Sequence, residues 1–450
     1  MIWKPNREHV TLSELVKIRH GWPFRSEAFS QELTGRPIVV SIGNFNYTGG
    51  FRFGSTATKE YREEYPREFE LIPGDLLVVM TCQTPGGEIL GIPARTPGDG
   101  RIYLHNQRMG KVVVRDSKRV DVAFLYWLFL SREFNRELVA TASGSKILHT
   151  SPSRIAAFGF DLPSIREQQG IAKILGALDD KIELNRRTNE TLEAMARALF
   201  KSWFVDFDPV HANKAGRAPA GMNAATASEF PNQLTESPLG MIPEGWTVGP
   251  IGQAVRVAGG STPSTSNPAF WDGEFAWTRP KDISDAPNKL LLATERTVTQ
   301  AGLDTISSGL LPPGAVLLSS RAPIGYIAYA RIPVAINQGY IELVCNGDTQ
   351  LTSLYVLHWL EFAMDEIKGR AGGTTFPEIS KGAFRTISTL IPPRSLLSKF
   401  DAAIKPNLDK VEVNARTSMK LKQLRDALLP KLLSGELRVP EAERIVGKAV

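Results

Sequence analysis

The sequence contains very little cysteine and histidine. Its two cysteines, Cys82 and Cys345, lie far apart in the 450-residue chain, and its six histidines are scattered. These residues form neither a disulfide framework nor a Cys-x-x-Cys metal site. The sequence therefore predicts no metal site, and its sparse cysteine is typical of a protein from a reducing compartment.

Long hydrophobic runs are also missing. The longest run, residues 122–130, is far shorter than the roughly 20 residues that a membrane-spanning helix needs. The first residues place proline and charge where a signal peptide needs an apolar stretch. With 42% hydrophobic and 22% charged residues, the composition is that of a globular protein with two to four domains. We expect a cytoplasmic protein with no membrane partner.

The excess of positive charge is small. A net charge of +6 is compatible with an acidic partner such as nucleic acid. However, residues 244–393 contain more Asp and Glu than Lys and Arg. The charge balance alone is therefore a weak argument for DNA binding.

The motifs of several enzyme classes are absent. The chain has no Gly-x-x-x-x-Gly-Lys-Ser/Thr loop to bind nucleotide phosphates and no Gly-x-Gly-x-x-Gly dinucleotide loop after a strand. Its Pro-Pro pairs lack the preceding Asn or Asp and the following aromatic residue of an amino methyltransferase. The sequence predicts a chain without catalytic residues, without a metal and without a cofactor of its own.

What the chain does contain is a long internal repeat. A shift of 229 positions superimposes residues 126–204 on 355–433 without a gap, and pairs Tyr126 with Tyr355 and Asn185 with Asn414. Upstream, residues 72–79 match 311–318 and the Asn-Gln pair at 106–107 matches that at 337–338. The chain is therefore expected to be two tandem copies of one design.

Each copy begins with short β-branched runs between Gly and Pro turns, followed by one amphipathic helix, at 122–137 and at 351–368. The fold class is therefore expected to be α+β, with a mixed domain in each copy. The expected organisation is domain 1 at 1–163, a long helical region at 164–208, a linker at 209–243, domain 2 at 244–393, and a second helical region with a tail at 394–450.

The two helical regions carry apolar rows with the alternating 4 and 3 spacing of a coiled coil. We call these the seam rows: 171, 175, 178, 182, 185, 189, 192, 196, 199 and 203 in copy one, and 400, 404, 407, 411, 414, 418, 421, 425, 428 and 432 in copy two. Two matching long helices favour an intramolecular antiparallel coiled coil. Asn185 and Asn414 are expected to fix its register at some cost in stability. A break at Gly176 would shorten the first helix.

These features resemble the specificity subunits of type I restriction-modification systems. The resemblance covers nearly the whole chain and is carried by Pro-Ser-Ile-Arg-Glu-Gln-Gln-Gly at 163–170, Ala-Leu-Phe-Lys-Ser-Trp-Phe at 198–204, Ala-Ile-Asn-Gln-Gly at 335–339 and Leu-Pro-Lys-Leu-Leu-Ser-Gly-Glu-Leu at 429–437. Copy two departs at 392–399, where Leu396 and Leu397 replace the Glu-Gln pair of copy one.

The resemblance implies a non-catalytic subunit that recognises a DNA site in two halves. Each variable domain would read one half-site of double-stranded DNA, and the helices would set the spacing and dock partners. The implied partners are two adenine-N6 methyltransferase subunits, which use S-adenosylmethionine, and restriction subunits that translocate DNA with ATP and Mg²⁺.

Base readout needs Arg, Lys, Asn, Gln, Ser or Thr on loops, with further Arg and Lys on phosphates. Glycine-containing loops with such donors occur at 143–150 and 372–377, and at 21–25 and 259–264. The Asn-Gln pairs are more consistent with turn-stabilising residues. The candidate DNA-binding residues are Arg25, Ser145, Lys146, His149, Thr150, Ser261, Thr262, Arg279, Lys281, Arg370, Thr374 and Thr375.

Two other interpretations stay open at this point. A stand-alone enzyme acting on DNA would need catalytic residues that the sequence does not display. A protein–protein scaffold without direct DNA readout would agree with the acidic second domain. An adenine methyltransferase gene beside this one would favour the specificity subunit over both.

The purified chain alone should neither methylate nor cut DNA, because its sequence offers no cofactor loop, metal cluster or activated nucleophile. Incubation with labelled S-adenosylmethionine and plasmid measures both activities. Label in the DNA, or a cut plasmid, would contradict this prediction.

Overall fold

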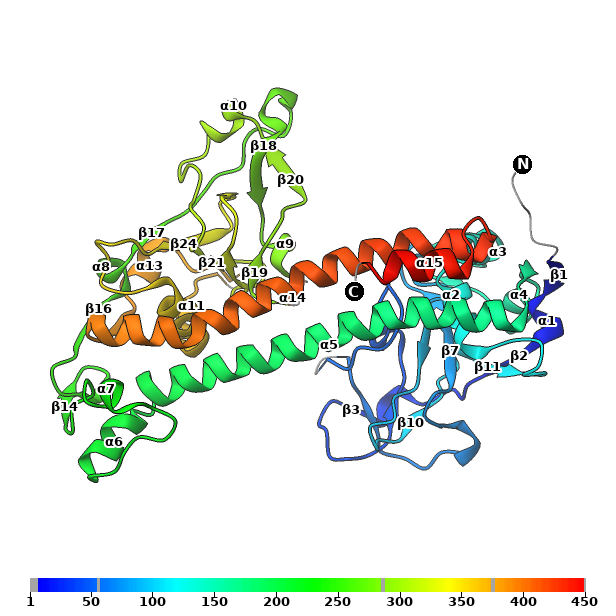
Figure 1. Ribbon diagram of the computed structural model, residues 1–450, viewed down its shortest axis with the longest axis horizontal. Coiled ribbons are helices and arrows are strands. Elements are labelled where there is room, and N and C mark those ends of the chain that lie inside the picture. Colours follow the sequence, from blue (N-terminus) through cyan, green and yellow to red (C-terminus); the bar gives the residue numbers. More distant parts are fainter. Residues whose placement is uncertain (1–6, 55–56, 285–287, 374–376, 449–450) are drawn as a thin grey trace. The chain divides into compact units, whose positions relative to one another are not determined.

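The computed structural model describes residues 7–54, 57–284, 288–373 and 377–448. The chain forms two compact units. Unit 1 consists of Met1–Ile182 and Lys420–Val450, and unit 2 of Glu183–Met419. Each unit contains the sheets of one sequence copy together with parts of both long helices (Figure 1).

Unit 1 is built on a four-stranded antiparallel sheet. Its strand order is β2 (Val16–His20), β11 (Met109–Val114), β7 (Leu76–Val79) and β9 (Pro93–Arg95). All four residues of β7 are buried, which agrees with its continuous β-branched and leucine sequence. A second sheet consists of five strands of two residues each, in the order β3 (Phe29–Ser30), β5 (Glu60–Tyr61), β4 (Ile38–Val39), β10 (Tyr103–Leu104) and β6 (Glu70–Leu71).

The helix expected at 122–137 is two helices. Helix α2 (Val122–Phe129) ends before Ser131, whose hydroxyl accepts a hydrogen bond from the Phe134 amide and caps α3 (Arg132–Thr141). Two further strand pairs of unit 1 are β1 (Glu8–Thr11) with β13 (Gly159–Leu162), and β8 (Thr81–Cys82) with β12 (Leu148–His149). Unit 1 also contains the short helices α1 (Leu12–Leu15) and α4 (Pro152–Ala156).

Unit 2 repeats this design. The order β17 (Arg256–Ala258), β24 (Tyr340–Val344), β21 (Val316–Ser319) and β22 (Ile327–Ala330) corresponds strand by strand to the four-stranded sheet of unit 1. In both units the chain enters and leaves through one antiparallel pair, which in unit 2 is β16 (Thr247–Pro250) with β25 (Ser388–Ile391). The α+β class and the tandem repeat are therefore confirmed.

Unit 2 differs mainly by insertions and by a second split helix. Strand β19 (Leu290–Leu291) extends the sheet, and β20 (Arg296–Val298), β18 (Trp271–Thr278) and β23 (Ala335–Ile336) form a separate sheet. The helix expected at 351–368 is α11 (Ser353–Phe362) followed by α12 (Met364–Gly369). Shorter helices are α8 (Ile251–Ala254), α9 (Lys281–Ser284), α10 (Gln300–Leu303) and α13 (Lys381–Arg385).

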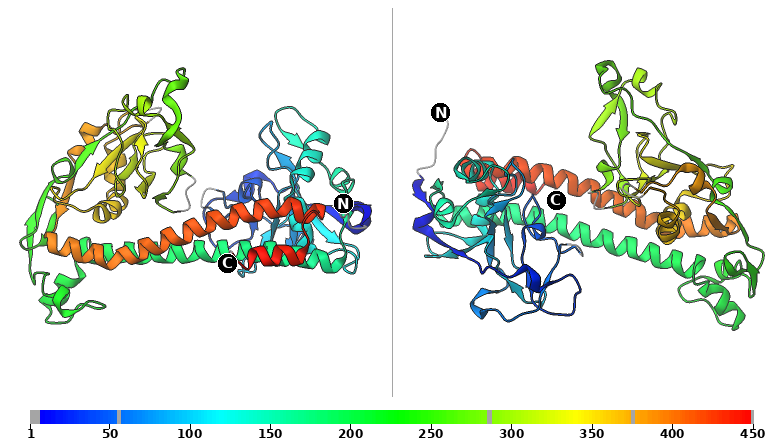
Figure 2. Two further views of the ribbon diagram at one scale, coloured as in Figure 1. Left: turned by 45° about the horizontal axis from the view of Figure 1, so that its top comes forward. Right: turned by 180° about the vertical axis from the view of Figure 1, so that it is seen from behind.

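The two long helices are longer than the seam rows required. Helix α5 (Ile165–Phe204) has 40 residues and α14 (Arg394–Ser434) has 41. Gly176 does not interrupt α5. Every position of both seam rows is buried or half-buried. In unit 1 the beginning of α5 lies beside the end of α14, and in unit 2 the end of α5 lies beside the beginning of α14 (Figures 1 and 2). This arrangement confirms an antiparallel coiled coil.

The segment expected to be a linker, residues 209–243, contains regular structure. It holds most of α6 (Asp208–Lys214), all of α7 (Ala224–Ala227), and a hairpin of β14 (Leu234–Ser237) with β15 (Gly240–Pro243). Val210 and Phe230 are buried in the core of unit 2, and Asn213 donates to the carbonyls of Ala227 and Phe230. Its Ala- and Gly-rich composition concealed these few anchoring side chains.

Gln168 fastens the beginning of α5 to its own domain. Its side chain is fully buried, donates to the carbonyls of Arg119 and Pro163 at 3.0 and 2.8 Å, and accepts from the Asp121 amide at 2.9 Å. The corresponding residue of copy two, Leu397, is equally buried but lies among apolar side chains. The loss of Glu-Gln in copy two therefore replaces a polar anchor with an apolar one.

A second anchor shows the same contrast. Arg7 is almost completely buried in unit 1, where its guanidinium pairs with Glu167 at 2.5 Å and donates to the last carbonyls of α14. The position that corresponds to Arg7 in copy two is Trp246, which packs on Phe204 at the end of α5. Helix α15 (Val439–Val446) completes unit 1 by packing on α5 where Gly170 leaves room for it (Figure 2).

Gln168→Leu, which introduces the residue of copy two, should lower the free energy of unfolding by at least about 3 kcal/mol. The change leaves one buried amide and two buried carbonyls without partners, and each costs about 1–3 kcal/mol. Gln423→Leu, at an exposed position of α14 in the same unit, is the matched control. Urea unfolding measures both, and equal stabilities would contradict the anchoring role.

Candidate nucleic-acid interface

In each unit, the loops singled out by the sequence leave one end of the four-stranded sheet. In unit 1, β2 ends at His20 and β7 ends at Val79, and β11 begins at Met109. The register pairs His20 with Gly110 and Val79 with Met109, so the three strand ends are neighbours. We call this end of the sheet, with its loops, the loop end.

Backbone hydrogen bonds hold the loops of unit 1 together. Thr150 donates its amide to the Met80 carbonyl, and Met80 donates its amide to the Arg108 carbonyl, each at 2.9 Å. On the other side, Gln107 donates its amide to the Trp22 carbonyl at 3.0 Å. The loops at 21–25, 106–108 and 143–149 therefore form one continuous surface rather than three independent tips.

Unit 2 reproduces this construction. The Ile379 amide donates to the Ser320 carbonyl at 3.0 Å, and the Ser320 amide donates to the Gly339 carbonyl at 2.8 Å. Thr262 then donates its hydroxyl to the Gln338 side chain at 2.5 Å. The segments near residues 260, 338 and 379 are thus joined in the same order as their counterparts in unit 1.

Two equivalent glycines shape the loops at 143–149 and 372–378. Gly144 and Gly373 have φ of 97° and 94°, a conformation that favours glycine over any residue with a Cβ atom. Each loop is closed by a backbone bridge, Ser143 with His149 and Gly372 with Glu378. The sequence placed these two loops at matching positions of the repeat, and the structure gives them matching closure.

Four of the five candidates in unit 1 lie on this surface. Arg25, Ser145, Lys146 and His149 are exposed. Thr150 is 8% exposed and lies beneath the loop, so its side chain does not reach the surface. The sequence pattern marked Thr150 because it is polar, but its position next to the strand pair β8–β12 buries it.

The candidates in unit 2 are more often used within the protein. Ser261 is half-buried, donates its hydroxyl to the Thr305 carbonyl and accepts from the Ser307 amide. Three other candidates also have partners within the protein. Thr262 donates to Gln338, Arg279 pairs with Glu295 at 2.6 Å, and Arg370 pairs with Glu366 at 2.6 Å. Lys281 is exposed, and Thr374 and Thr375 lie outside the described residues.

The asparagines of the two Asn-Gln pairs stabilise turns, which agrees with the structural role expected for these pairs. The side-chain oxygen of Asn106 accepts from the Arg108 amide at 3.1 Å, and that of Asn337 accepts from the Gly339 amide at 2.9 Å. Each asparagine thereby fixes the turn that precedes β11 or β24. Each of these turns positions the loops on both sides of it.

Sequence reasoning missed three basic residues at the two loop ends. Arg108 is exposed in the Asn-Gln turn of unit 1, and Arg321 is partly exposed directly after β21. Lys381 begins α13, and its ammonium group lies beside Gly259. The alignment of strand ends between the copies would have indicated Arg108 and Arg321, whereas only the tertiary structure brings Lys381 to this end.

The seam asparagines form a buried polar layer in unit 2. Asn414 donates to the Asn189 side chain at 2.9 Å, and Asn185 donates to the Ser418 hydroxyl at 3.1 Å. Asn189 also donates to the Val411 carbonyl at 3.3 Å and contacts Asn288 at 3.4 Å. Asn185 and Asn414 thus lie in the same layer, and Asn189 joins them.

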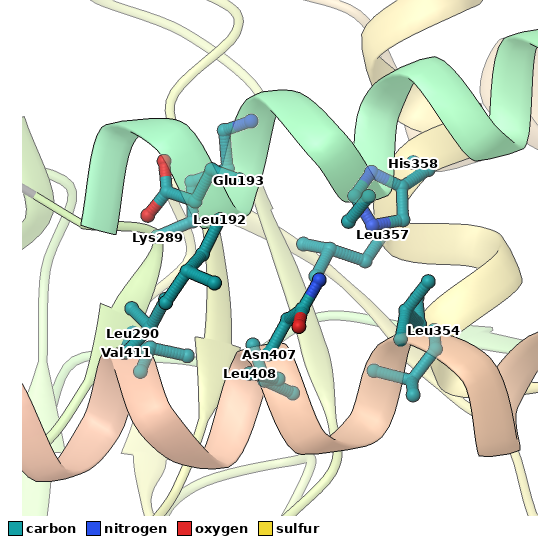
Figure 3. Close-up of a pocket in the computed structure, with 12 residues that line it drawn as sticks. Leu192, Glu193, Lys289, Leu290, Leu354, Leu357, His358, Asn407, Leu408 and Val411 are labelled. Carbon is teal, nitrogen blue, oxygen red and sulfur yellow. The ribbon is translucent and has the colours of Figure 1, made fainter. Parts of the chain in front are cut away.

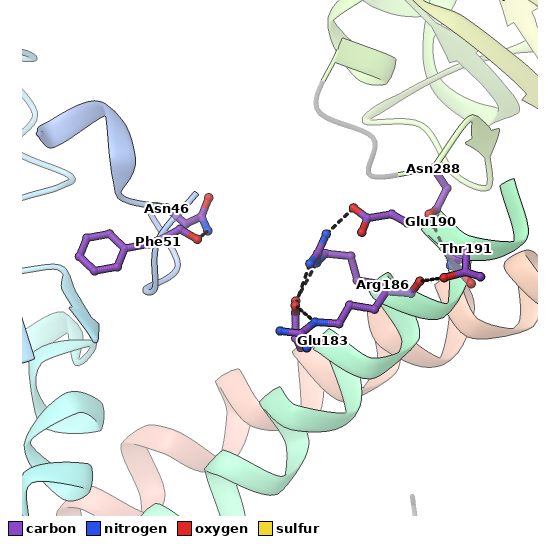
Figure 4. A network of polar contacts seen from close by, with 9 residues as sticks. Asn46, Phe51, Glu183, Arg186, Glu190, Thr191 and Asn288 are labelled. Atoms are coloured by element: carbon purple, nitrogen blue, oxygen red, sulfur yellow. Dashed lines mark hydrogen bonds and ion pairs between the residues drawn. The ribbon is translucent and has the colours of Figure 1, made fainter. Parts of the chain in front are cut away.

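Charged residues of α5 surround this layer on its outer side. Arg186 pairs with Glu183 at 2.7 Å and also with Glu190, and the Thr191 hydroxyl bonds to a carbonyl of its own helix (Figure 4). These side chains are partly exposed, so each ion pair contributes little to stability. The surface ion pairs therefore contribute little to the pairing of the two helices.

Unit 1 places a different polar contact in the seam. Arg425 is 6% exposed and donates to Asp179 of α5 at 2.5 Å. Burial raises the pKa of Asp179, and the attraction of Arg425 offsets only part of that shift. Leu424, beside Arg425 in the sequence, packs against the core of unit 1.

In unit 2 the helix pair is braced by α11 and by β19. A cavity of about 30 Å³, large enough for a water molecule, separates Leu192 and Val411 from Leu354 and Leu357 (Figure 3). Beside it, Glu361 of α11 pairs with Lys289 at 2.5 Å. Burial would raise the pKa of Glu361, but His358 and Lys289 outweigh it and lower the pKa to about 2.

Across 7–54, 57–284, 288–373 and 377–448, His, Cys, Asp and Glu side chains do not gather into a group that could hold a metal ion. In the same part of the chain, the long helices are too polar to cross a membrane.

The family described as the type I restriction modification DNA specificity domain matches the chain twice, at residues 7–194 and 243–416. The chain belongs to this family. The two matches coincide with the two copies of the repeat. Each match includes one loop end and part of one long helix.

Relatives agree over most of the chain. The specificity subunit of the type I restriction enzyme HindI from Haemophilus influenzae is 26% identical, over 78% of this chain and 86% of the relative. The MjaIX specificity subunit from Methanocaldococcus jannaschii is 28% identical, over 75% of this chain and 73% of the relative. The crystal structure of a type I S subunit from M. genitalium has the same fold, with a TM-score of 0.58 and 14% identity over 96% of this chain and 98% of that one.

Asn414→Ala should lower the free energy of unfolding by about 1–3 kcal/mol, because it leaves the buried Asn189 side-chain oxygen without its donor. Val413→Ala, at an exposed neighbouring position, is the control and should change stability by less than about 0.5 kcal/mol. Denaturant unfolding of both variants makes the comparison. Similar losses would show that the asparagine layer does not hold the helices.

Proposed function

We propose that this chain is the DNA-recognition subunit of a type I restriction-modification complex. In this proposal it carries out no chemistry, and each unit uses its loop end to read one half of a split DNA site. The observation that carries the proposal is the duplicated loop end itself. Two copies of one surface, built on equivalent strand ends and closed by equivalent glycine loops, fit a ligand that is recognised in two separate parts.

The chemistry of the loop ends supports double-stranded DNA as the ligand. In unit 1, Arg25, Arg108 and Lys146 are exposed cations among neutral donors such as Ser145. Cations of this kind bind phosphates, and Ser, Gln and His side chains on the same surface supply hydrogen bonds to base edges. In unit 2, Arg321 and Lys381 provide the positive charge that its acidic overall composition conceals.

The helices have the length that a spacer between two half-sites requires. At 1.5 Å per residue, the 40 residues of α5 span about 60 Å. Successive major-groove faces on one side of B-DNA are about 34–36 Å apart. A helix pair of this length is sufficient to hold two recognition domains one turn of DNA apart.

The helices also offer a docking surface for adenine methyltransferase subunits. Leu184 and Met195 of α5 are each 56% exposed, three helical turns apart on one face. Between them, Thr188 and Thr191 donate their hydroxyls to carbonyls of their own helix, so their methyl groups remain available for packing. S-adenosylmethionine would be bound by those partners, and ATP and Mg²⁺ by restriction subunits.

The spacer should follow the length of the helix pair. Four residues are inserted after Thr191 of α5 and four after Lys410 of α14. Each insertion lengthens its helix by about 6 Å and rotates the following seam positions by only about 40° from their original face. The half-sites should stay unchanged while the spacer between them lengthens by one or two base pairs. Long-read mapping of methylated adenines in cells that carry the complex measures both.

The control for this experiment is a four-residue insertion after Gly216, in the exposed turn that follows α6. It should leave the spacer unchanged, because it lengthens neither helix. An active complex whose spacer ignores the paired insertion would contradict the role of the helices as a ruler.

A further inference from the structure

At each loop end, one cross-strand pair occupies the same place and differs in chemistry between the units. In unit 1 the pair is Thr81 with His149, joined by the β8–β12 ladder. In unit 2 it is Arg321 with Glu378, joined by an antiparallel bridge. Both pairs lie where the strand equivalent to β7 ends and where the glycine loop closes.

The side chains of each pair contact one another. Thr81 is buried, whereas His149, Arg321 and Glu378 are at least partly exposed. The Thr81 hydroxyl lies 3.1 Å from Nδ1 of His149, and His149 is exposed. The Arg321 guanidinium lies 3.6 Å from the Glu378 carboxylate, with 40% and 46% of the two side chains exposed. A half-exposed ion pair at this distance contributes little to the stability of the fold, so it can be exchanged for a ligand at small cost.

The surrounding structure holds the backbone of Arg321 in place. Ser319 accepts amide hydrogen bonds from Gly325 and Tyr326 and donates to the Pro323 carbonyl at 2.8 Å, which fixes the loop that follows Arg321. Ser320 is bonded to Gly339 on one side and to Ile379 on the other. A long side chain therefore projects from a backbone that is fixed on three sides.

We propose that Arg321 and His149 are the specificity-determining residues at this shared position, each held by its partner, Glu378 or Thr81, until DNA binds. The inference rests on the proposed function. An arginine fork pairs with the O6 and N7 atoms of guanine in the major groove, so Arg321 selects a guanine in its half-site. Nε2 of His149 makes a single hydrogen bond, and a single donor to N7 accepts either purine.

The test is made on the complex with its methyltransferase subunits, by mapping methylated adenines and by measuring binding to cognate and random duplexes. Arg321→Gln should lower cognate binding by about 5- to 150-fold and relax one base pair in one half-site only. His149→Ala should relax one position in the other half-site. Arg416→Gln, which removes another half-exposed arginine of unit 2 and leaves its partner Glu412 paired with Arg331, is the matched control and should leave the motif unchanged.

Glu378→Gln separates base reading from a structural role. It removes the same ion pair but keeps Arg321, so the guanine preference should persist. If Arg321→Gln and Glu378→Gln have the same effect, the pair is only structural and the inference is wrong. Arg321→Lys keeps the charge without the fork, and it should retain random-DNA binding and lose the guanine preference. It decides the question if Arg321→Gln does not assemble.

The outcomes also distinguish this inference from the proposed function. A complex with the unchanged chain that methylates no split site would defeat the proposed function itself. A split site that Arg321→Gln and Arg321→Lys leave unaltered would overturn only the assignment of Arg321, and equal losses on cognate and random DNA would do the same.

Discussion

The burial of the two seam rows, on helices of 40 and 41 residues, is the constraint on which the rest of this structure depends. A single small domain cannot cover a helix of that length, so each helix must find most of its cover on the other one. The chain satisfies this by placing a second helix with the same spacing after a second domain. The duplication of the sequence and the antiparallel pairing of α5 and α14 are thus two aspects of one solution.

Once the helices are paired, their ends must be fastened to the sheet domains, and the two copies do this with different chemistry. Unit 1 uses Gln168 and the Arg7–Glu167 pair, whereas unit 2 uses Leu397 and Trp246. Buried hydrogen bonds demand one geometry, because a displaced partner leaves an unsatisfied group, whereas apolar contacts tolerate small shifts. The repeat therefore conserves the positions of the anchors without conserving their residue types.

The loop ends follow from the same organisation. Each domain presents to its surroundings the sheet end whose loops are tied together by the Asn-Gln turn, and that turn is fixed by a single asparagine side chain in both copies. Because the scaffold beneath the loops is the same, residues on top of it can differ without disturbing the fold. The contrast between Thr81–His149 and Arg321–Glu378 is the clearest case.

The sequence by itself determined the repeat, the mixed domains and the paired helices, because periodic apolar spacing and matched offsets are properties of neighbouring residues. It also located the glycine loops, but only the tertiary structure decided which polar residues face solvent there: Thr150 is buried, Ser261 and Arg279 are occupied by partners within the protein, and Arg108, Arg321 and Lys381 lie at the loop ends. The tertiary structure also showed that α2 and α3 are separate helices and that residues 209–243 pack on unit 2. The physical reason is that exposure and pairing depend on contacts between residues far apart in the chain, which no local pattern records.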